Sequence, residues 1–186
     1  MRYLIGLFAT LGLIILILVL LLRGGGSSPT EAKALKLADY ATSGSAAHYI
    51  IDGPIVADQK HQEVKIDVDA EQVTFTLYAG YDGEVTKQQT YLNSDKAYAV
   101  FLRALQNEGF TKGNADPKLQ DERGVCPLGQ RRIYAFTDGS KQLMRFWSTG
   151  CDIKTFGGKI NNVATLFRNQ VPDYNEQVSG TSFDTL

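Results

Sequence analysis

Two arginines and two aromatic residues late in the chain have the types and spacing that suit ligand binding. A two-residue turn at 138–139 would set Arg132 directly opposite Arg145, with Tyr134 and Trp147 on the same face of the hairpin. Two guanidinium groups beside aromatic rings can hold a carboxylate or a phosphate. We therefore predict that these four residues form a ligand-binding patch for an anion.

A structural interpretation of the same arginines stays open. Like charges directly opposed across a sheet destabilise it. Both side chains would then extend into solvent or pair with a carboxylate of the long preceding loop, such as Asp121 or Glu122. Ion pairs of this kind are common on protein surfaces and need no ligand to explain them.

The two cysteines of the chain are predicted to form a disulfide. The same hairpin register places Cys126 opposite Cys151 at a non-hydrogen-bonded position, where Cα atoms lie about 4.5 Å apart. A disulfide accepts separations of about 4.4–6.8 Å. The alternative is a pair of buried free thiols. Because disulfides persist outside the cytosol, the bond favours an extracytoplasmic domain.

Other reactive residue types do not combine into a motif. Neither histidine lies at a metal-ligand spacing from a second candidate ligand, and His61 looks solvated beside two polar residues. Residues 67–78 lack the glycine and glutamate of a calcium loop, and residues 157–160 lack the pattern of a P-loop. We predict no catalytic residue, metal ligand or cofactor, and the sequence favours a non-catalytic protein.

Composition excludes one class of partner. The 186 residues carry 19 Lys and Arg against 20 Asp and Glu, for a net charge of −1. Nucleic-acid binding requires a basic footprint, which this chain does not have. We therefore expect no nucleic acid among the partners.

A long apolar run near the start predicts a membrane span. Residues 3–22 carry no charged side chain, and about 20 helical residues cross the roughly 30 Å hydrocarbon core of a bilayer. Signal peptides that are cleaved have shorter apolar regions of about 7–15 residues. We therefore expect residues 1–23 to be a retained signal anchor, with the lipid bilayer as the partner of residues 3–22.

The orientation of this span rests on two opposing signals. Basic residues are slightly more frequent after the run than before it, which favours a cytoplasmic C-terminal domain. Long C-terminal domains can cross the membrane regardless of such charges, however. The cysteines decide in favour of a cytoplasmic N-terminus and an extracytoplasmic domain at the cell membrane.

The rest of the chain predicts one α+β domain. We expect a Gly/Ser linker at 24–28, a domain at 29–171 and a flexible polar tail at 172–186. Alternating and three-four hydrophobic patterns predict the order αββββαββα, with about three helices on a largely antiparallel sheet. The helices are expected at 29–41, 95–108 and 158–169, and the strands at 49–51, 64–68, 73–79, 85–92, 131–136 and 142–147.

These features lead to three functional hypotheses. The first is a single-pass, non-catalytic module that binds an envelope protein or an anionic ligand. The second is an envelope hydrolase with catalytic residues from distant segments. The third follows from outline alone: an apolar N-terminal helix, a small α+β head and a C-terminal disulfide resemble type IV pilins and pseudopilins. The chain departs from them, because residues 3–22 contain no glutamate and residues 24–26 are glycines.

Overall fold

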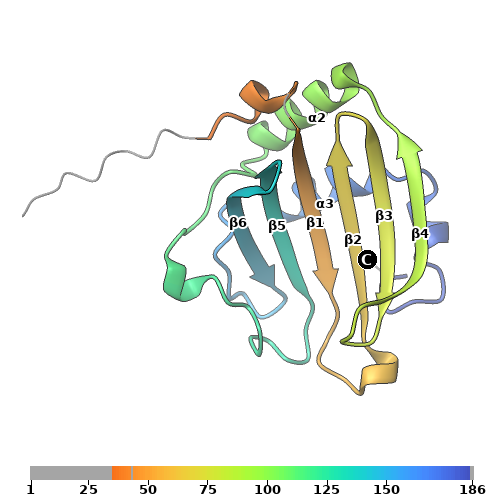
Figure 1. The fold of residues 1–186 in the computed structure, drawn as a ribbon. Coiled ribbons are helices and arrows are strands. Elements are labelled where there is room, and N and C mark those ends of the chain that lie inside the picture. Colours follow the sequence, from red (N-terminus) through yellow and green to blue (C-terminus); the bar gives the residue numbers. More distant parts are fainter. Residues whose placement is uncertain (1–34, 43, 185–186) are drawn as a thin grey trace, which may run out of the picture. The chain divides into compact units, whose positions relative to one another are not determined.

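A computed structural model describes residues 35–42 and 44–184, which form an α+β domain with one six-stranded antiparallel sheet. The strand order is β4-β3-β2-β1-β5-β6, and Figure 1 shows this order across the sheet. The strands are β1 (Ser45–Asp52), β2 (Gln62–Asp69), β3 (Gln72–Ala79), β4 (Glu84–Leu92), β5 (Arg131–Asp138) and β6 (Lys141–Thr149). The predicted α+β class and antiparallel sheet are confirmed.

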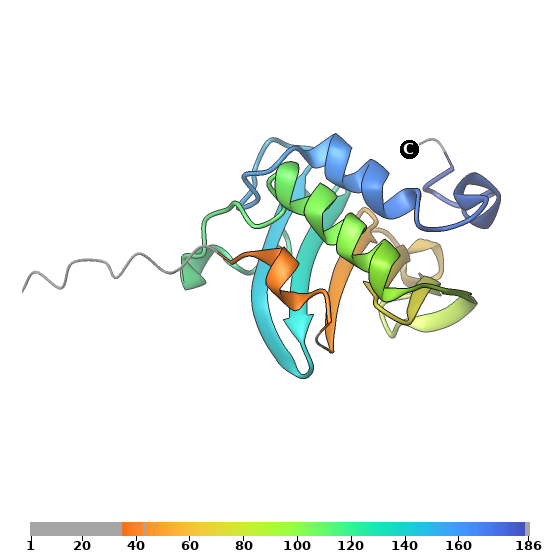
Figure 2. The same cartoon turned by 90° about the horizontal axis from the view of Figure 1, so that it is seen from above.

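Alternation along the central strands creates the core. Along β1, buried and partly exposed residues alternate without interruption, and in β2 the side chains of Val64, Ile66 and Val68 are fully buried. Successive side chains of a strand point to opposite faces, so one face of the sheet is apolar. The helices α2 (Asp95–Asn107) and α3 (Ile160–Arg168) cover this face, side by side (Figure 2).

The two long helices pack through aromatic side chains, and a side-chain cap begins α2. The Ser94 side chain caps α2 by accepting a hydrogen bond from the Ala97 amide at 3.3 Å. From α3, Phe167 stacks on Tyr49 of β1 with ring centroids 5.3 Å apart, and it meets Phe101 of α2 edge-on. An aromatic cluster therefore joins both helices to the middle of the sheet.

The segment expected to be a flexible polar tail packs into the domain instead. It contains the one-turn helix α4 (Tyr174–Gln177), and the Tyr174 ring lies edge-on to Phe75. Val178 and Phe183 are also buried, and Phe183 is 0% exposed. A few apolar side chains in a polar stretch outweigh its average composition, because each buried aromatic ring contributes a large apolar area.

The N-terminal predictions lie mostly outside the described residues. This holds for the apolar span at 3–22, the linker and most of the helix expected at 29–41. The described part of that helix is a single 3₁₀ turn, η1 (Leu37–Tyr40), with Leu37 buried. Within residues 35–42 and 44–184, every helix is too short or too polar to cross a bilayer.

Candidate functional site

The hairpin of β5 and β6 does not have the predicted register. Asp138 pairs with Lys141, so the turn consists of Gly139 and Ser140, and a further register shift follows between Phe136 and Thr137. As a result Arg132 lies opposite Ser148 and Arg145 lies opposite Ala135. The predicted juxtaposition of the two arginines was therefore wrong. The turn begins one residue later than predicted and a bulge adds a residue to one strand. The hydrophobic pattern alone reveals neither change.

The four residues of the predicted anion patch are divided between the two faces of the sheet. Tyr134 pairs with Phe146 on the helix side, where its ring stacks on Phe156 at 3.9 Å. Arg132 has the same parity as Tyr134 and therefore points to the same side. Trp147 and Arg145 have the opposite parity to Phe146 and point to the other face, so the hairpin does not bring the four together.

Arg145 and Trp147 instead hold the long loop between α2 and β5 against the sheet. Arg145 donates from Nη2 to a Glu122 carboxylate oxygen at 2.6 Å and from Nη1 to the Gln120 carbonyl at 2.7 Å. The Trp147 indole N–H donates to the Leu119 carbonyl at 2.8 Å. The alternative interpretation, in which an arginine pairs with a loop carboxylate such as Glu122, is confirmed for Arg145.

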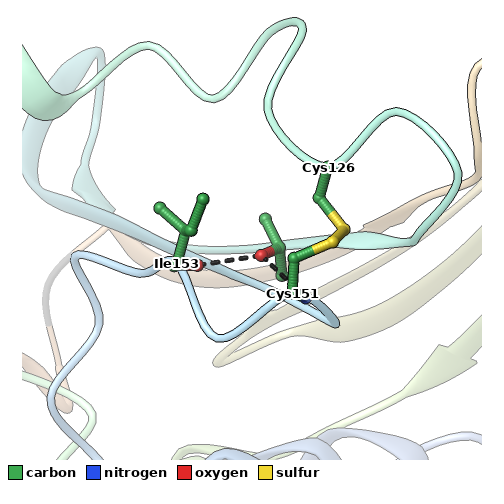
Figure 3. Close-up of a disulfide and its surroundings, with 4 residues drawn as sticks. Cys126, Cys151 and Ile153 are labelled. Carbon is green, nitrogen blue, oxygen red and sulfur yellow. Dashed lines mark hydrogen bonds between the residues drawn. A yellow bond between two sulfur atoms is a disulfide. The ribbon is translucent and has the colours of Figure 1, made fainter.

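The predicted disulfide is present between Cys126 and Cys151, with Cα atoms 5.8 Å apart (Figure 3). The two cysteines do not face each other across the ladder as predicted, because Cys126 precedes β5 and Cys151 follows β6. Loop contacts position Cys151: the Thr149 hydroxyl accepts from the Cys151 amide and donates to the Ile153 carbonyl. The bond thus ties the end of the long loop to the turn that follows β6.

A pocket of about 400 Å³ opens at the end of the sheet where β1 and β3 end and β2 and β5 begin. Its volume lies in the range of small-molecule sites. The disulfide-bonded loop contributes one wall through Arg123 and Gly124. The other walls include two aromatic residues and four residues that can carry charge, namely Tyr78, Tyr81, Asp52, His61, Glu63 and Arg131. We refer to this site as the Arg131 pocket.

Arg131 is the buried cation of the pocket. It is 3% exposed, and its Nε donates to an Asp52 carboxylate oxygen at 2.7 Å. Its Nη2 donates to the Gly53 carbonyl. Its Nη1 is buried and has no hydrogen-bond partner among the described residues. Buried polar atoms are almost always hydrogen-bonded, so this donor is an exception that requires an explanation.

His61 was expected to be solvated, but it is 5% exposed. Its Nε2 lies 3.2 Å from the second Asp52 oxygen and its Nδ1 lies 3.3 Å from the Pro54 carbonyl. Its ring stacks on Tyr81 with centroids 4.0 Å apart. Both ring nitrogens therefore lie close to an oxygen atom, and the Asp52 carboxylate contacts His61 as well as Arg131.

The carboxyl group of Glu63 has a pKa that its surroundings raise. It lies between Asp52 of β1 and Tyr78 of β3 in the ladders. Burial and, to a smaller extent, the Asp52 carboxylate raise the pKa of Glu63 to about 7, while Lys65 opposes the rise. A carboxyl group that is half protonated near neutral pH can donate or accept a proton, as groups in functional sites often do.

Sequence reasoning missed this site because its parts are dispersed. Asp52 and Arg131 lie 79 residues apart in the chain and become direct partners only through the β1–β5 register. A weak signal existed, since Asp52 ends a strand pattern and Arg131 begins another. His61 and Glu63 carry no local motif at all.

A second polar cluster lies on the helix-free face of the sheet. His48 Nδ1 contacts an Asp67 oxygen at 2.5 Å, and His48 Nε2 lies 3.0 Å from the Thr137 hydroxyl. Lys65 pairs with the other Asp67 oxygen at 3.0 Å. Among residues 35–42 and 44–184, His, Cys, Asp and Glu side chains form no group of three placed to hold a metal ion.

Comparisons with known proteins supply no relative. The chain has no significant match to a protein-family model, to a curated protein or to a solved structure. A fold class by itself does not imply a function. The function must therefore be argued from the chemistry of the Arg131 pocket.

Proposed function

We propose that this protein is a membrane-tethered, extracytoplasmic module that binds a small ligand, or a small group of an envelope partner, in the Arg131 pocket. The observation that carries the proposal is the Arg131 Nη1 atom, a buried cationic donor without a partner among the described residues. A ligand acceptor would complete its hydrogen bonds. The aromatic and charged lining of the pocket supplies further contacts for orientation.

The proposed location rests on two features. The disulfide between Cys126 and Cys151 supports an oxidising compartment. The uncharged run at 3–22 supports a bitopic anchor with a cytoplasmic N-terminus. Protease treatment of intact cells tests the topology. Digestion of the domain supports an outward orientation, and protection until the membrane is permeabilised contradicts it.

A ligand screen tests the binding function. The full-length protein in detergent is screened by thermal shift against organic acids, amino acids, saccharides and short peptides. We expect at least one class to stabilise the wild type and to lose its effect in Arg131→Gln. Arg103→Gln, which changes an exposed arginine of α2, is the matched control and should retain the effect. If every stabilising compound acts equally on both variants, the pocket is not the binding site.

The second candidate function is an envelope hydrolase, and the Thr137, His48 and Asp67 cluster is the observation that favours it. The contacts of His48 with Thr137 and Asp67 have the order of a nucleophile, a base and an orienting carboxylate. His48 Nε2 would accept the hydroxyl proton as Thr137 attacks an acyl carbon, and would return it to the departing alcohol. Asp67 would hold the ring by accepting from Nδ1.

A fluorophosphonate probe separates the two candidates. A hydrolase would be labelled at Thr137, and His48→Gln would remove the label, whereas Thr90→Ala on the exposed strand β4 would not. Absence of label on Thr137 in the wild type contradicts the hydrolase. The resemblance to pilins stays a prediction, because it depends on the N-terminal residues outside the described part.

A further inference from the structure

In the Arg131 pocket, one carboxylate contacts two basic side chains. Arg131 and His61 both turn to one carboxylate, and each takes a different oxygen of Asp52. The guanidinium and the imidazole ring therefore share one carboxylate. Arg131 Nη1 still lacks a hydrogen-bond acceptor among the described residues, and a carboxylate is the acceptor that a guanidinium binds most strongly.

Glu63 does not supply the missing acceptor. A carboxylate paired with a cation has a lowered pKa, but that of Glu63 is raised, chiefly by burial and by Asp52. The charged groups around it are Asp52 on β1, Lys65 on its own strand and Glu122 on the long loop. Tyr78 lies opposite it on β3, and Arg131, His61 and Arg123 line the same pocket.

The protonation of Glu63 determines whether a second anion is tolerated. When Glu63 is neutral, it does not repel an anionic ligand, and its O–H can donate to one. When it is ionised, the ligand would have to approach two carboxylates, those of Asp52 and Glu63, across a low-dielectric pocket. A neutral ligand would offer the Arg131 guanidinium only an uncharged acceptor, which makes a weaker hydrogen bond than a carboxylate does.

We propose, building on the proposed binding function, that the Arg131 pocket takes a carboxylate group, which accepts from Arg131 Nη1 and is bound together with a proton on Glu63. The affinity then decreases as the pH rises. Between pH 6 and pH 8 the neutral fraction of a group that titrates near pH 7 decreases about tenfold, so the affinity should decrease about tenfold as well.

The test uses two probes that differ only at the group in question. N-acetylglycine carries a carboxylate and N-acetylglycinamide carries a carboxamide. Binding to the full-length protein in detergent is measured by calorimetry at pH 6 and pH 8. We expect the acid to bind at pH 6, about tenfold more weakly at pH 8, and the amide to bind at neither pH.

Two variants assign the effect to residues. Glu63→Gln should bind the acid with most of its pH dependence removed, and Arg131→Gln should lose binding while Arg103→Gln retains it. If Arg131→Gln does not fold, Glu63→Gln and the amide probe still decide. N-acetylglycylglycine and acetate as further probes distinguish a peptide chain end from a free small acid as the source of the carboxylate.

Three results would overturn the inference. Equal binding of acid and amide would exclude a carboxylate requirement. Full pH dependence in Glu63→Gln would exclude the proton on Glu63. Binding of neither probe would reject the ligand class. None of these results contradicts the broader binding function, which fails only if the ligand screen finds no compound that depends on Arg131.

Discussion

Arg145 and Arg131 are both partly or fully removed from solvent, yet their surroundings differ in one respect. Arg145 donates from both terminal nitrogens to loop oxygens, and the Glu122 carboxylate balances its charge. Arg131 shares its only carboxylate with His61 and retains a buried donor without a partner among the described residues. A satisfied arginine holds structure together, whereas an unsatisfied one marks a site for a ligand.

The two regions are also physically connected. The loop that Arg145 and Trp147 hold continues to Arg123 and Gly124, which form a wall of the Arg131 pocket. The disulfide then fastens its end, and the Ile55 amide donates to the Pro127 carbonyl at 2.7 Å. Substitutions in these loop contacts should therefore mainly lower the stability of the domain, and they should weaken ligand binding to a smaller extent.

Loss of the disulfide should have the largest effect on stability. The bond joins residues 25 apart in sequence, so Cys126→Ser with Cys151→Ser should lower the free energy of unfolding by about 2–3 kcal/mol. Chemical denaturation of the full-length protein measures the change. Reduction of the wild type is the matched control and should give a similar loss. A loss below about 0.5 kcal/mol would mean that the other loop contacts suffice.

Removal of the loop arginine should have the next largest effect. Arg145→Met leaves the Glu122 carboxylate, whose side chain is 12% exposed, without its cation. We expect a loss of about 2 kcal/mol, because hydrogen bonds to charged groups contribute about 1.5–3 kcal/mol. Asp121→Asn removes an ion pair with Arg123 that is exposed and should cost less stability than Arg145→Met. Equal losses would mean that the Arg145–Glu122 contact stabilises the domain no more than the exposed Asp121–Arg123 pair does.

Glu63 should make the stability of the protein decrease as the pH rises, whereas a carboxylate paired with a cation has the opposite effect. Its pKa is about 7 in the folded protein and near 4.5 when unperturbed. The folded state therefore binds more protons between these values, and stability decreases as the pH rises through this window. Glu63→Gln should remove this decrease and be more stable than the wild type at pH 8 by about 1 kcal/mol, allowing for solvent screening. Parallel pH profiles would contradict this expectation.

The Tyr81 hydroxyl should have the smallest effect. It accepts from the Val56 amide and donates to the Val56 carbonyl, but these contacts are exposed. Tyr81→Phe retains the stacking on His61 and should lower stability by about 0.5 kcal/mol. Tyr81→Ala also removes the ring and should cost more. If the two variants lose the same amount, the stacking does not contribute to the pocket.

The elements of the fold were predictable to a large extent. The alternation of Val64, Ile66 and Val68 and the helical spacing of Phe101 and Leu105 follow directly from the periods of strand and helix. The C-terminal segment was not predicted, because a few buried rings such as Phe183 do not form a periodic pattern. The disulfide was predicted correctly from a wrong register, since loops rather than a ladder bring the cysteines together.

The sequence by itself determined the kind of domain: the periods of its apolar residues specify the strands and helices, and its two cysteines leave one disulfide to form. The tertiary structure decided where the chemistry lies. The shifted turn and the bulge of the β5–β6 hairpin together separated Arg132 from Arg145, and the β1–β5 register joined Asp52 to Arg131. Local patterns depend on neighbours a few residues apart, whereas a site depends on long-range register and on which buried donor finds an acceptor.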